Sequence, residues 1–369
     1  MHFKLFSADN ISELHVEGVD HLIAQYLASG CQPFIANVDT EMNLLQYQGM
    51  TMPFSINNKE YETSYVCSPY NAFVSYGRDA LLASIPTVLR TPLKVLINGL
   101  ASPLKWMRIN RCVQMNNRLW ATNLSPEQSE FPVYDMRRYF TKAYPDHALA
   151  FRSLTQSLNQ NIITKLKSDG FILLPSRPIC MIDYRTPLPK RKNSSKNDKR
   201  HLNNTQYQLI DIHDTRYSTE LHQLYHKLYI EQHSPHNPQF TPLFFHTCIE
   251  QKAMEIKALQ DPQTGKLVAM LGLFIEGNVL TVPFCGYDTA LDKKQQLYPI
   301  LNAITARICD ERQLICHASA GAMDYKRARG GVEEMEYTAI YVNHLPWFRQ
   351  CGWKILSRLS RAFFKEQTQ

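Results

Sequence analysis

One stretch carries most of the information about the fold: Cys316-His317-Ala318-Ser319-Ala320-Gly321-Ala322-Met323-Asp324-Tyr325-Lys326-Arg327-Ala328-Arg329-Gly330-Gly331. The apolar run before it predicts a buried strand over 314–318, and small residues then form a turn. A short basic helix follows, for which Asp324 is a suitable N-cap because Asp accepts hydrogen bonds from free helix N–H groups. A second strand is predicted over 335–342. The stretch therefore indicates a strand, a turn, a short helix and another strand.

Upstream of this stretch, hydrophobic periodicity predicts a regular alternation of elements. Turn signals at 261–265 and 276–278 separate the three strands of a meander. The predicted elements are a strand over 207–212, helices over 221–228 and 242–252, strands over 256–259, 266–275 and 279–285, and a helix over 297–308.

The first half of the chain shows a related but less complete order. Residues 105–123 alternate like strands, and a helix, a buried strand and a second helix are predicted over 133–143, 148–154 and 157–169. Ser157 and Gln160 form a capping-box pattern at the start of the second helix, and Gly170 can end it. Two strands, 171–174 and 179–182, complete this half.

A basic segment divides the chain. Residues 187–201 contain six Lys or Arg, one Asp and no apolar residue after Leu188. This composition favours a solvated linker or mobile loop, with electrostatic docking of an acidic partner as the alternative. The predicted organisation is an N-terminal module over 1–187, a basic linker over 188–204 and a C-terminal module over 205–369.

Composition excludes several classes of protein. The chain has 369 residues, 44% hydrophobic and 20% charged, which excludes wholesale disorder, and only 14 Gly, which excludes a fibrous protein. The net charge of +7 favours an acidic partner but falls short of a dedicated nucleic-acid binder, so no DNA partner is expected. The nine cysteines never form a CxxC pair, which predicts free thiols in a reducing compartment and no structural metal site.

The sequence lacks several targeting segments and catalytic motifs, which narrows the expected cellular location and reaction class of the protein. No apolar signal-like segment begins the chain, and the longest apolar stretch, near 267–275, is much shorter than a bilayer span of about 20 residues. We therefore expect a cytoplasmic protein. The serine-hydrolase GxSxG, phosphate-loop GxxxxGK[ST], zinc-protease HExxH and dinucleotide GxGxxG patterns are all absent.

The element order resembles the GNAT-type N-acyltransferase fold, and the chain resembles two such modules in tandem, the plan of Fem-type peptidyltransferases. The resemblance rests on 316–331, covers 205–345 and extends to 100–185 by element order; residues 1–100 have no match. It implies an α/β fold with a mixed sheet, the C-terminal module being the more complete. It also implies an acyltransferase, with N-acyl transfer favoured over O-acyl transfer.

One departure from the family concerns the acyl donor. Acetyl-CoA-using members carry a glycine-rich loop whose backbone N–H groups hold the pyrophosphate. The corresponding residues 287–297 have no glycine after Gly286. The resemblance then implies no tightly bound cofactor and a thioester co-substrate, either acyl-CoA held differently or an acyl carrier protein. A charged tRNA is the further alternative; both carriers are acidic, which suits the basic chain.

The resemblance also suggests the site, where the fourth and fifth strands of the C-terminal module separate. Lys326 matches the lysine of the Fem-type pattern and could bind a phosphate or the oxyanion; the alternative is an exposed lysine on a basic helix. His317 is a catalytic candidate or a hydrogen-bonded core residue, Asp324 a base or only a cap, and Tyr287 a proton donor to the leaving group or a packing residue. Residues expected to bind substrate are Glu231, His233, Cys285, Ser319 and Tyr325. For Glu231 and His233 a solvated loop is the alternative, and for Cys285 a buried thiol.

Two other segments have open interpretations. The aromatic-rich stretch 61–76 could line an acyl pocket or form a pair of core strands. The C-terminal stretch 347–365 interleaves apolar and basic residues, so it could lie on the inner face of an anionic membrane or pack on the core.

Three functions follow as hypotheses. The first is acyl transfer from a thioester donor to an amine or hydroxyl of a small-molecule or lipid-like acceptor. The second is an aminoacyl-tRNA-dependent peptidyltransferase of Fem type. The third is a catalytically silent module that binds a carrier protein.

Overall fold

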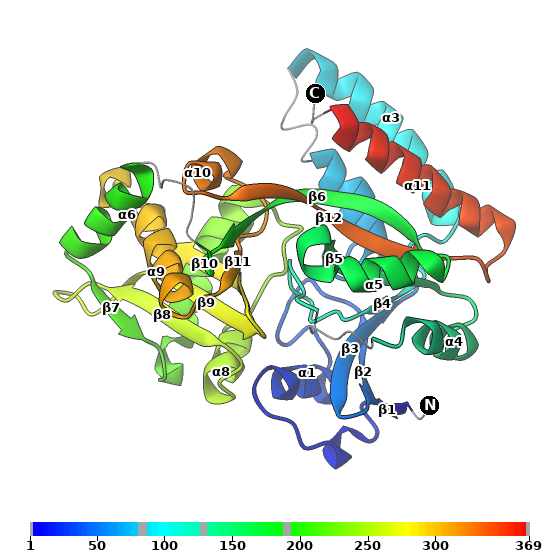
Figure 1. Cartoon of the computed structure of the whole chain (residues 1–369), viewed down its shortest axis with the longest axis horizontal. Helices are drawn as coiled ribbons and strands as arrows, with labels where there is room; N and C mark the ends of the chain where they lie inside the picture. The colour runs from blue at the N-terminus through cyan, green and yellow to red at the C-terminus, as the bar shows by residue number, and fades with distance from the viewer. Residues whose placement is uncertain (1–2, 80–86, 126–130, 187–192, 367–369) are drawn as a thin grey trace.

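The chain is built around one continuous mixed sheet of twelve strands in the order β1-β2-β3-β4-β5-β12-β6-β11-β10-β9-β8-β7 (Figure 1). The computed structural model describes residues 3–79, 87–125, 131–186 and 193–366. The strands are β1 Lys4–Phe6, β2 Glu41–Tyr47, β3 Met50–Asn57, β4 Cys112–Met115, β5 Ala148–Thr155, β6 Ile172–Asp183, β7 Gln208–Asp211, β8 Glu255–Gln260, β9 Leu267–Glu276, β10 Val279–Tyr287, β11 Ile315–His317 and β12 Val332–Tyr341.

Helices cover both faces of this sheet. The α-helices are α1 Gly18–Ser29, α3 Thr87–Trp106, α4 Val133–Ala143, α5 Gln156–Ser168, α6 Asn193–Asn204, α7 Ser218–Tyr225, α8 Pro242–Glu250, α9 Leu297–Glu311, α10 Met323–Arg327 and α11 Trp347–Glu366. Two π-helices, η2 Asn71–Ser75 and η4 His226–His233, and three 3-10 helices, η1 Ile11–Glu13, η3 Thr215–Tyr217 and η5 Lys293–Gln295, complete the described elements.

The strand order is symmetric about the central pair of β6 and β12. Each side has five outer strands, and on each side two neighbouring strands are parallel, β4 with β5 and β10 with β11; all other pairs are antiparallel. The last strand of the C-terminal half, β12, lies between β5 and β6 of the N-terminal half. The chain is therefore a mixed α/β protein whose two halves exchange a strand, which confirms the predicted α/β class with a mixed sheet.

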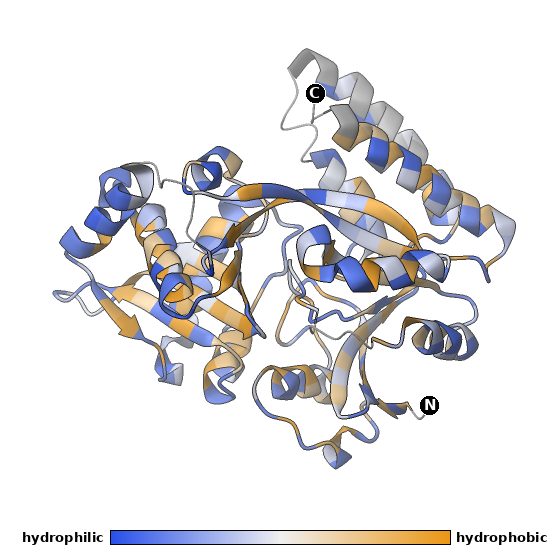
Figure 2. Ribbon diagram, in the orientation of Figure 1, coloured by the Kyte–Doolittle hydropathy of each residue, from blue (hydrophilic) through white to orange (hydrophobic). Residues whose placement is uncertain are grey.

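Apolar side chains explain why the sheet is covered on both faces. Strands β9 and β10 are mainly apolar in Figure 2, and α9 packs Ile300, Ile304 and Ile308 against them in one buried cluster. On the N-terminal side, Phe54, Phe140 and Phe151 belong to a corresponding cluster. Removing these side chains from water supplies the main driving force for both halves.

The segment predicted as a solvated linker contains a helix. Residues 187–192 lie outside the described part, but α6 occupies 193–204 and packs beside α9. Asp198 is buried because Arg329 forms an ion pair with it and the Tyr325 hydroxyl donates to it at 2.9 Å. The linker prediction was wrong for 193–204 because this tertiary pairing leaves no apolar stripe in the sequence. The division of the chain into 1–187 and 205–369 stays a prediction.

Other local predictions also need correction. The strand pattern over 105–123 yields only β4, because α3 continues to Trp106 and buried asparagines shape the turns after Met115. The strands expected at 171–174 and 179–182 are one strand, β6. It tolerates Pro175 and Pro178 because its edge facing β11 is paired only at Met181–Asp183, so no ladder bond is lost there.

The C-terminal helix packs on the core. Trp353 and Leu356 of α11 are buried, and Gly352 lies against Met107 beyond the end of α3. Arg349 donates to the carbonyl oxygens of Arg108 and Arg111. This favours the packing interpretation of 347–365, and a membrane contact stays a prediction. In the described part of the chain, no helix combines the length and the apolar run that crossing a bilayer requires.

Candidate active site

A cavity of about 450 Å³ opens where β10 and β11 separate. The two strands are paired in parallel from Val279 to Thr281 and from Ile315 to His317, and β10 then loses its register with β9 between Thr281 and Phe284. The cavity lining comes from β10, from β11 with the loop after it, from α9, and from residues near the two π-helices. π-Helices are frequent at functional sites, so their presence here supports a functional cavity.

Two glycines allow this geometry. A Cβ at Gly286 would lie 2.6 Å from the Leu224 carbonyl oxygen, so only glycine lets α7 approach β10 this closely. A Cβ at Gly272 would lie 2.4 Å from the Phe284 ring, which covers that glycine. The close approach of α7 carries η4 over the sheet and places the Tyr229 hydroxyl 3.7 Å from the Cys285 Sγ.

His317 lies on the cavity wall and is 1% exposed. The Ser319 N–H donates to its Nδ1 at 3.3 Å, so the neutral ring carries its proton on Nε2. Nε2 has no hydrogen-bond partner among the described residues and lies 3.9 Å from the Glu336 Oε2. Burial lowers the pKa of His317 to about 4, although the Glu336 charge opposes the shift. A neutral, buried N–H donor therefore borders the cavity.

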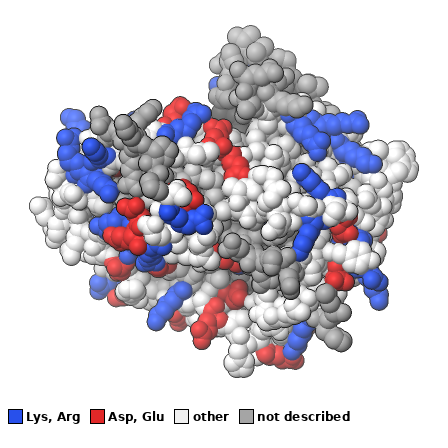
Figure 3. All heavy atoms as spheres, viewed as in Figure 1, with Lys and Arg blue, Asp and Glu red and all other residues white. Residues whose placement is uncertain are grey.

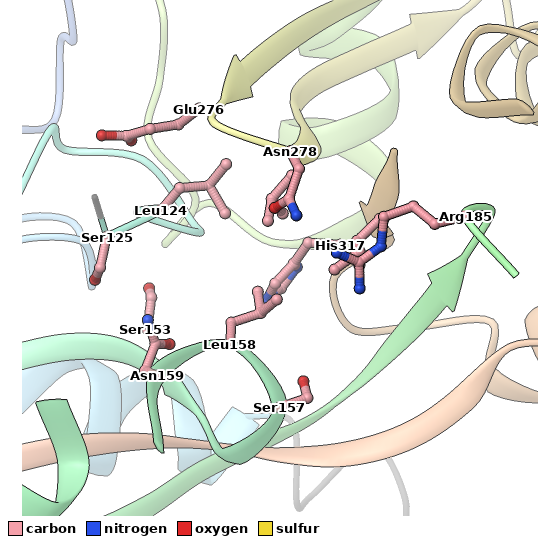
Figure 4. A pocket seen from close by; sticks show the side chains of 12 residues that line it. Leu124, Ser125, Ser153, Ser157, Leu158, Asn159, Arg185, Glu276, Asn278 and His317 are labelled. Carbon is pink, nitrogen blue, oxygen red and sulfur yellow. The ribbon is translucent and has the colours of Figure 1, made fainter. Parts of the chain in front are cut away.

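The same histidine borders a second, smaller cavity of about 120 Å³ (Figure 4). Figure 4 shows His317 close to Leu158 of α5, with Asn278 from the β9–β10 turn on the other side. His317 thus separates two hollows of the molecule.

Behind His317, Arg177 and Glu336 form a largely buried ion pair at the centre of the sheet, in which the Arg177 side chain is 23% exposed and the Glu336 side chain 5%. They are directly opposite each other on β6 and β12, and Arg177 donates from Nε to Oε1 at 3.0 Å and from Nη2 to Oε2 at 3.1 Å. Arg177 Nη2 also donates to the Ala121 carbonyl oxygen and the Thr122 hydroxyl. Burial favours a lower pKa for Arg177, but the Glu336 charge and hydrogen bonds raise it overall.

Sequence reasoning did not identify this pair. One signal in the sequence could have indicated it: Glu336 is a charged residue inside the apolar strand predicted over 335–342. Arg177 lies between two segments predicted as separate strands, so its sequence neighbours did not indicate that its side chain is partly buried.

Lys326, the leading candidate from sequence, is 6% exposed and borders the cavity. Its ammonium group donates to the carbonyl oxygens of Ala318 at 2.6 Å, Ser319 at 3.1 Å and Ala320 at 2.8 Å. Burial lowers its pKa. Because an ammonium group has three N–H donors, all of them are used, and Lys326 closes the loop after β11. Its predicted contact with an oxyanion stays a prediction.

The structure brings three other predicted residues, Ser319, Cys285 and His233, to the same cavity. Ser319 lies in the loop after β11, 3.5 Å from the Thr122 hydroxyl, and Cys285 lines the cavity from β10. Burial raises the pKa of the Cys285 thiol. His233 is the last residue of η4 and lies at the rim of the cavity, exposed to solvent. Partial desolvation of its ring by the surrounding protein lowers its pKa.

Four predicted residues do not line this cavity. Asp324 has a side chain that is 98% exposed and pairs with Arg327, and Glu231 is exposed and contacts His226. Tyr325 instead donates to Asp198, and Tyr287 packs near the end of β10. The N-cap of α10 is Ala322, and Asp324 lies inside the first turn of that helix without capping it, so the predicted cap was wrong. The other roles predicted for these four residues stay predictions. The aromatic stretch 61–76 forms turns and η2 rather than two strands, and its Tyr65 and Tyr76 line the cavity.

No group of three or more potential metal ligands occurs within the described ranges.

At the level of sequence, no protein-family model and no curated protein matches the chain. Solved structures do match. FemX aligns with a TM-score of 0.52 at 8% identity, over 95% of this chain and 100% of FemX.

Two further structures align less closely. L-PGS from Bacillus licheniformis gives a TM-score of 0.41 at 12% identity over 60% of this chain and 76% of its own. A tandem GNAT protein from the clavulanic acid biosynthesis pathway gives 0.38 at 9% identity over 94% and 99%. The FemX alignment spans both halves of the chain, and the chain therefore has the same overall fold as FemX.

Proposed function

We propose that the protein transfers an acyl group from a thioester donor to an amine or hydroxyl acceptor in the 450 Å³ cavity. The observation that carries this proposal is the cavity itself, at the separation of two parallel strands and bordered by a buried histidine whose Nε2 has no partner in the described structure. An unsatisfied buried donor is costly. Nε2 is sealed from solvent in this structure, and a small shift of the ring toward the cavity would bring it to a carbonyl oxygen of a bound acyl group, which would satisfy it.

The donor enters this proposal as a carrier-bound thioester. Exposed Lys293 and Lys294 precede α9, and Lys196, Lys199 and Arg200 lie exposed on α6 beside it. Figure 3 shows basic side chains gathered over α6. An acidic acyl carrier protein complements this surface, and steering by opposite charge raises association rates. No tightly bound cofactor is required.

The chemistry assigns a task to each histidine. The acceptor nitrogen or oxygen attacks the thioester carbonyl carbon, a C–N or C–O bond forms, and the C–S bond breaks as the thiolate leaves on its carrier. His233, neutral and at the rim, takes the acceptor proton. The His317 Nε2–H donates to the carbonyl oxygen as negative charge develops there. An amine acceptor is favoured because it is the stronger nucleophile.

The test is a donor and acceptor screen followed by intact mass. Acyl-CoA, acyl carrier protein and charged tRNA are each incubated with the enzyme and a mixture of primary amines and alcohols. We expect an acceptor that gains the acyl mass with acyl carrier protein as the donor. His233→Gln should lower kcat/KM by about 10²-fold or more, whereas the exposed control His213→Gln should not.

Other outcomes contradict parts of the proposal. Product formed only from charged tRNA would favour the peptidyltransferase alternative. Tight carrier binding without product from any donor would favour the silent carrier-binding module. Equal turnover by His233→Gln and the wild type would remove His233 as the base.

A further inference from the structure

The N-terminal module has its own small cavity, of about 90 Å³, next to its parallel strand pair. Gln114 of β4 and Ala150 and Arg152 of β5 line it, together with aromatic residues of the 61–76 stretch. Tyr65, Tyr76 and Arg177 line both this cavity and the 450 Å³ cavity. The two hollows therefore meet at these three side chains.

Arg152 is the unusual residue of the small cavity. One guanidinium nitrogen, Nη1, donates to the Val66 carbonyl oxygen at 2.5 Å and reaches the Asn117 Oδ1 at 3.5 Å. Nε and Nη2 have no hydrogen bond in the described structure, and they are not among its sealed polar atoms. Part of the guanidinium fork is thus free to meet a ligand.

The charge at this site is not balanced. Among the described residues, no carboxylate lies within 4.0 Å of Arg152, and Glu336 is the single carboxylate that lines the cavity. Both Glu336 oxygens already accept from Arg177. Two guanidinium groups therefore face one carboxylate, and because arginine stays protonated in proteins, one positive charge has no partner.

A partly buried charge without a partner is unfavourable unless a ligand neutralises it. One unbalanced positive charge calls for one negative charge, and a guanidinium fork matches the two oxygens of a carboxylate. The volume admits only a terminal group, and the walls beside Arg152 are partly apolar, with Ala72, Phe73 and Trp353.

We infer that Arg152 binds the carboxylate of the acceptor substrate, whose amine or hydroxyl extends past Tyr65 and Tyr76 into the 450 Å³ cavity. The acceptor is then an amino acid, a hydroxy acid or a molecule that ends in one. This inference rests on the proposed function for the word acceptor, but the anion site itself does not.

Binding can be tested without any turnover. Saturation-transfer NMR and calorimetry would compare 3-phenylpropionate with its neutral isostere 3-phenylpropionamide, and with inorganic phosphate. We expect the carboxylate to bind the wild-type protein at least 10-fold more tightly than the amide. Arg152→Gln should weaken carboxylate binding about 10- to 100-fold and leave the amide unchanged.

Two variants serve as controls. Arg152→Lys keeps the charge but loses the fork, so an intermediate affinity is expected, and it also guards against misfolding of Arg152→Gln. Arg138→Gln removes an exposed arginine of α4 that lies outside both cavities and should change nothing. Equal binding of carboxylate and amide, or full carboxylate affinity in Arg152→Gln, would overturn the inference. Tighter binding of phosphate than of carboxylate would also overturn it.

The acyl-transfer screen separates this inference from the proposed function. Carboxylate binding that depends on Arg152, without product from any donor, would retain the anion site and refute the acyltransferase. Acyl transfer to acceptors with and without a carboxylate at equal kcat/KM would retain the acyltransferase and refute the inference that Arg152 binds the carboxylate of the acceptor.

Discussion

The Arg177–Glu336 pair gives the sharpest test of how the centre of the molecule is held together. In Glu336→Gln the side chain keeps its shape and loses its charge. Two charge-assisted hydrogen bonds become weaker, and Arg177 joins Arg152 as a cation without a carboxylate partner. Removing one member of a buried pair typically costs about 3–5 kcal/mol, so the free energy of unfolding should fall by about that amount.

The same strand supplies a matched control. Glu333 of β12 pairs with Arg327 at 3.0 Å, but the two side chains are 40% and 53% exposed. Exposed pairs contribute about 0–1 kcal/mol, so Glu333→Gln should change stability little. Urea unfolding followed by circular dichroism measures both variants. If the burial argument holds, the two variants should differ by at least about 2 kcal/mol.

A double-mutant cycle isolates the interaction. Arg177→Met alone leaves Glu336 as an uncompensated carboxylate, whereas the double variant Arg177→Met/Glu336→Gln buries neither charge. We expect the double variant to be more stable than the sum of the single changes by about 1–3 kcal/mol. Additive effects, or a loss below about 1 kcal/mol in Glu336→Gln, would refute the reasoning.

Three further outcomes are expected. Burial lowers the pKa of His317 from 6.5 to about 4, so the neutral ring contributes fully to the free energy of unfolding above pH 6.5, and about 3 kcal/mol of that free energy is lost as the pH falls toward 4. Between pH 7.5 and 4.5, urea unfolding should therefore show a smaller loss of stability in His317→Gln than in the wild type. Lys326→Met leaves three carbonyl oxygens without their donor and should cost about 2–4 kcal/mol, with faster amide hydrogen exchange over 318–322; unchanged exchange would contradict its structural task. Gly272→Ala places a methyl group against the Phe284 ring and should cost about 1–3 kcal/mol, which Phe284→Leu in the same chain should partly restore in thermal unfolding.

The sequence allowed the fold to be predicted where the pattern is local. The strand predicted over 314–318 and the helix over 133–143 follow from apolar spacing, and the structure has both, the strand as Ile315–His317 and the helix with the predicted bounds. Helix α6 escaped prediction because its 193–204 residues are almost all polar. Its position depends on Asp198 meeting Arg329, 131 residues away, which no local pattern contains.

Some residues of the candidate site could likewise be predicted from the sequence, and others could not. Cys285, His317 and Ser319 lie on neighbouring strands and their loop, so a resemblance in element order sufficed to place them near one cavity. Arg177 and Glu336 are 159 residues apart and meet only through the exchange of β6 and β12. Part of the Arg152 guanidinium group is free because no acceptor lies beside it in the described structure. A single sequence does not show which side chains lack a partner.

The exchange of β6 and β12 links the completion of the fold to the completion of the site. Strand β6 brings Arg177 from the N-terminal half, and β12 brings Glu336 from the C-terminal half, so their ion pair forms only when both halves are folded against each other. Each half alone would lack the strand that its neighbour places beside β5 or β11, and would expose an edge there. Arg177 of this pair lines both the 90 Å³ and the 450 Å³ cavities, whereas Glu336 lines only the smaller one. The contact between Arg177 and Glu336, which joins the two halves, also occupies the Glu336 carboxylate and so leaves Arg152 without a carboxylate partner. The anion site and the acyl-transfer site would therefore form at the same stage of folding.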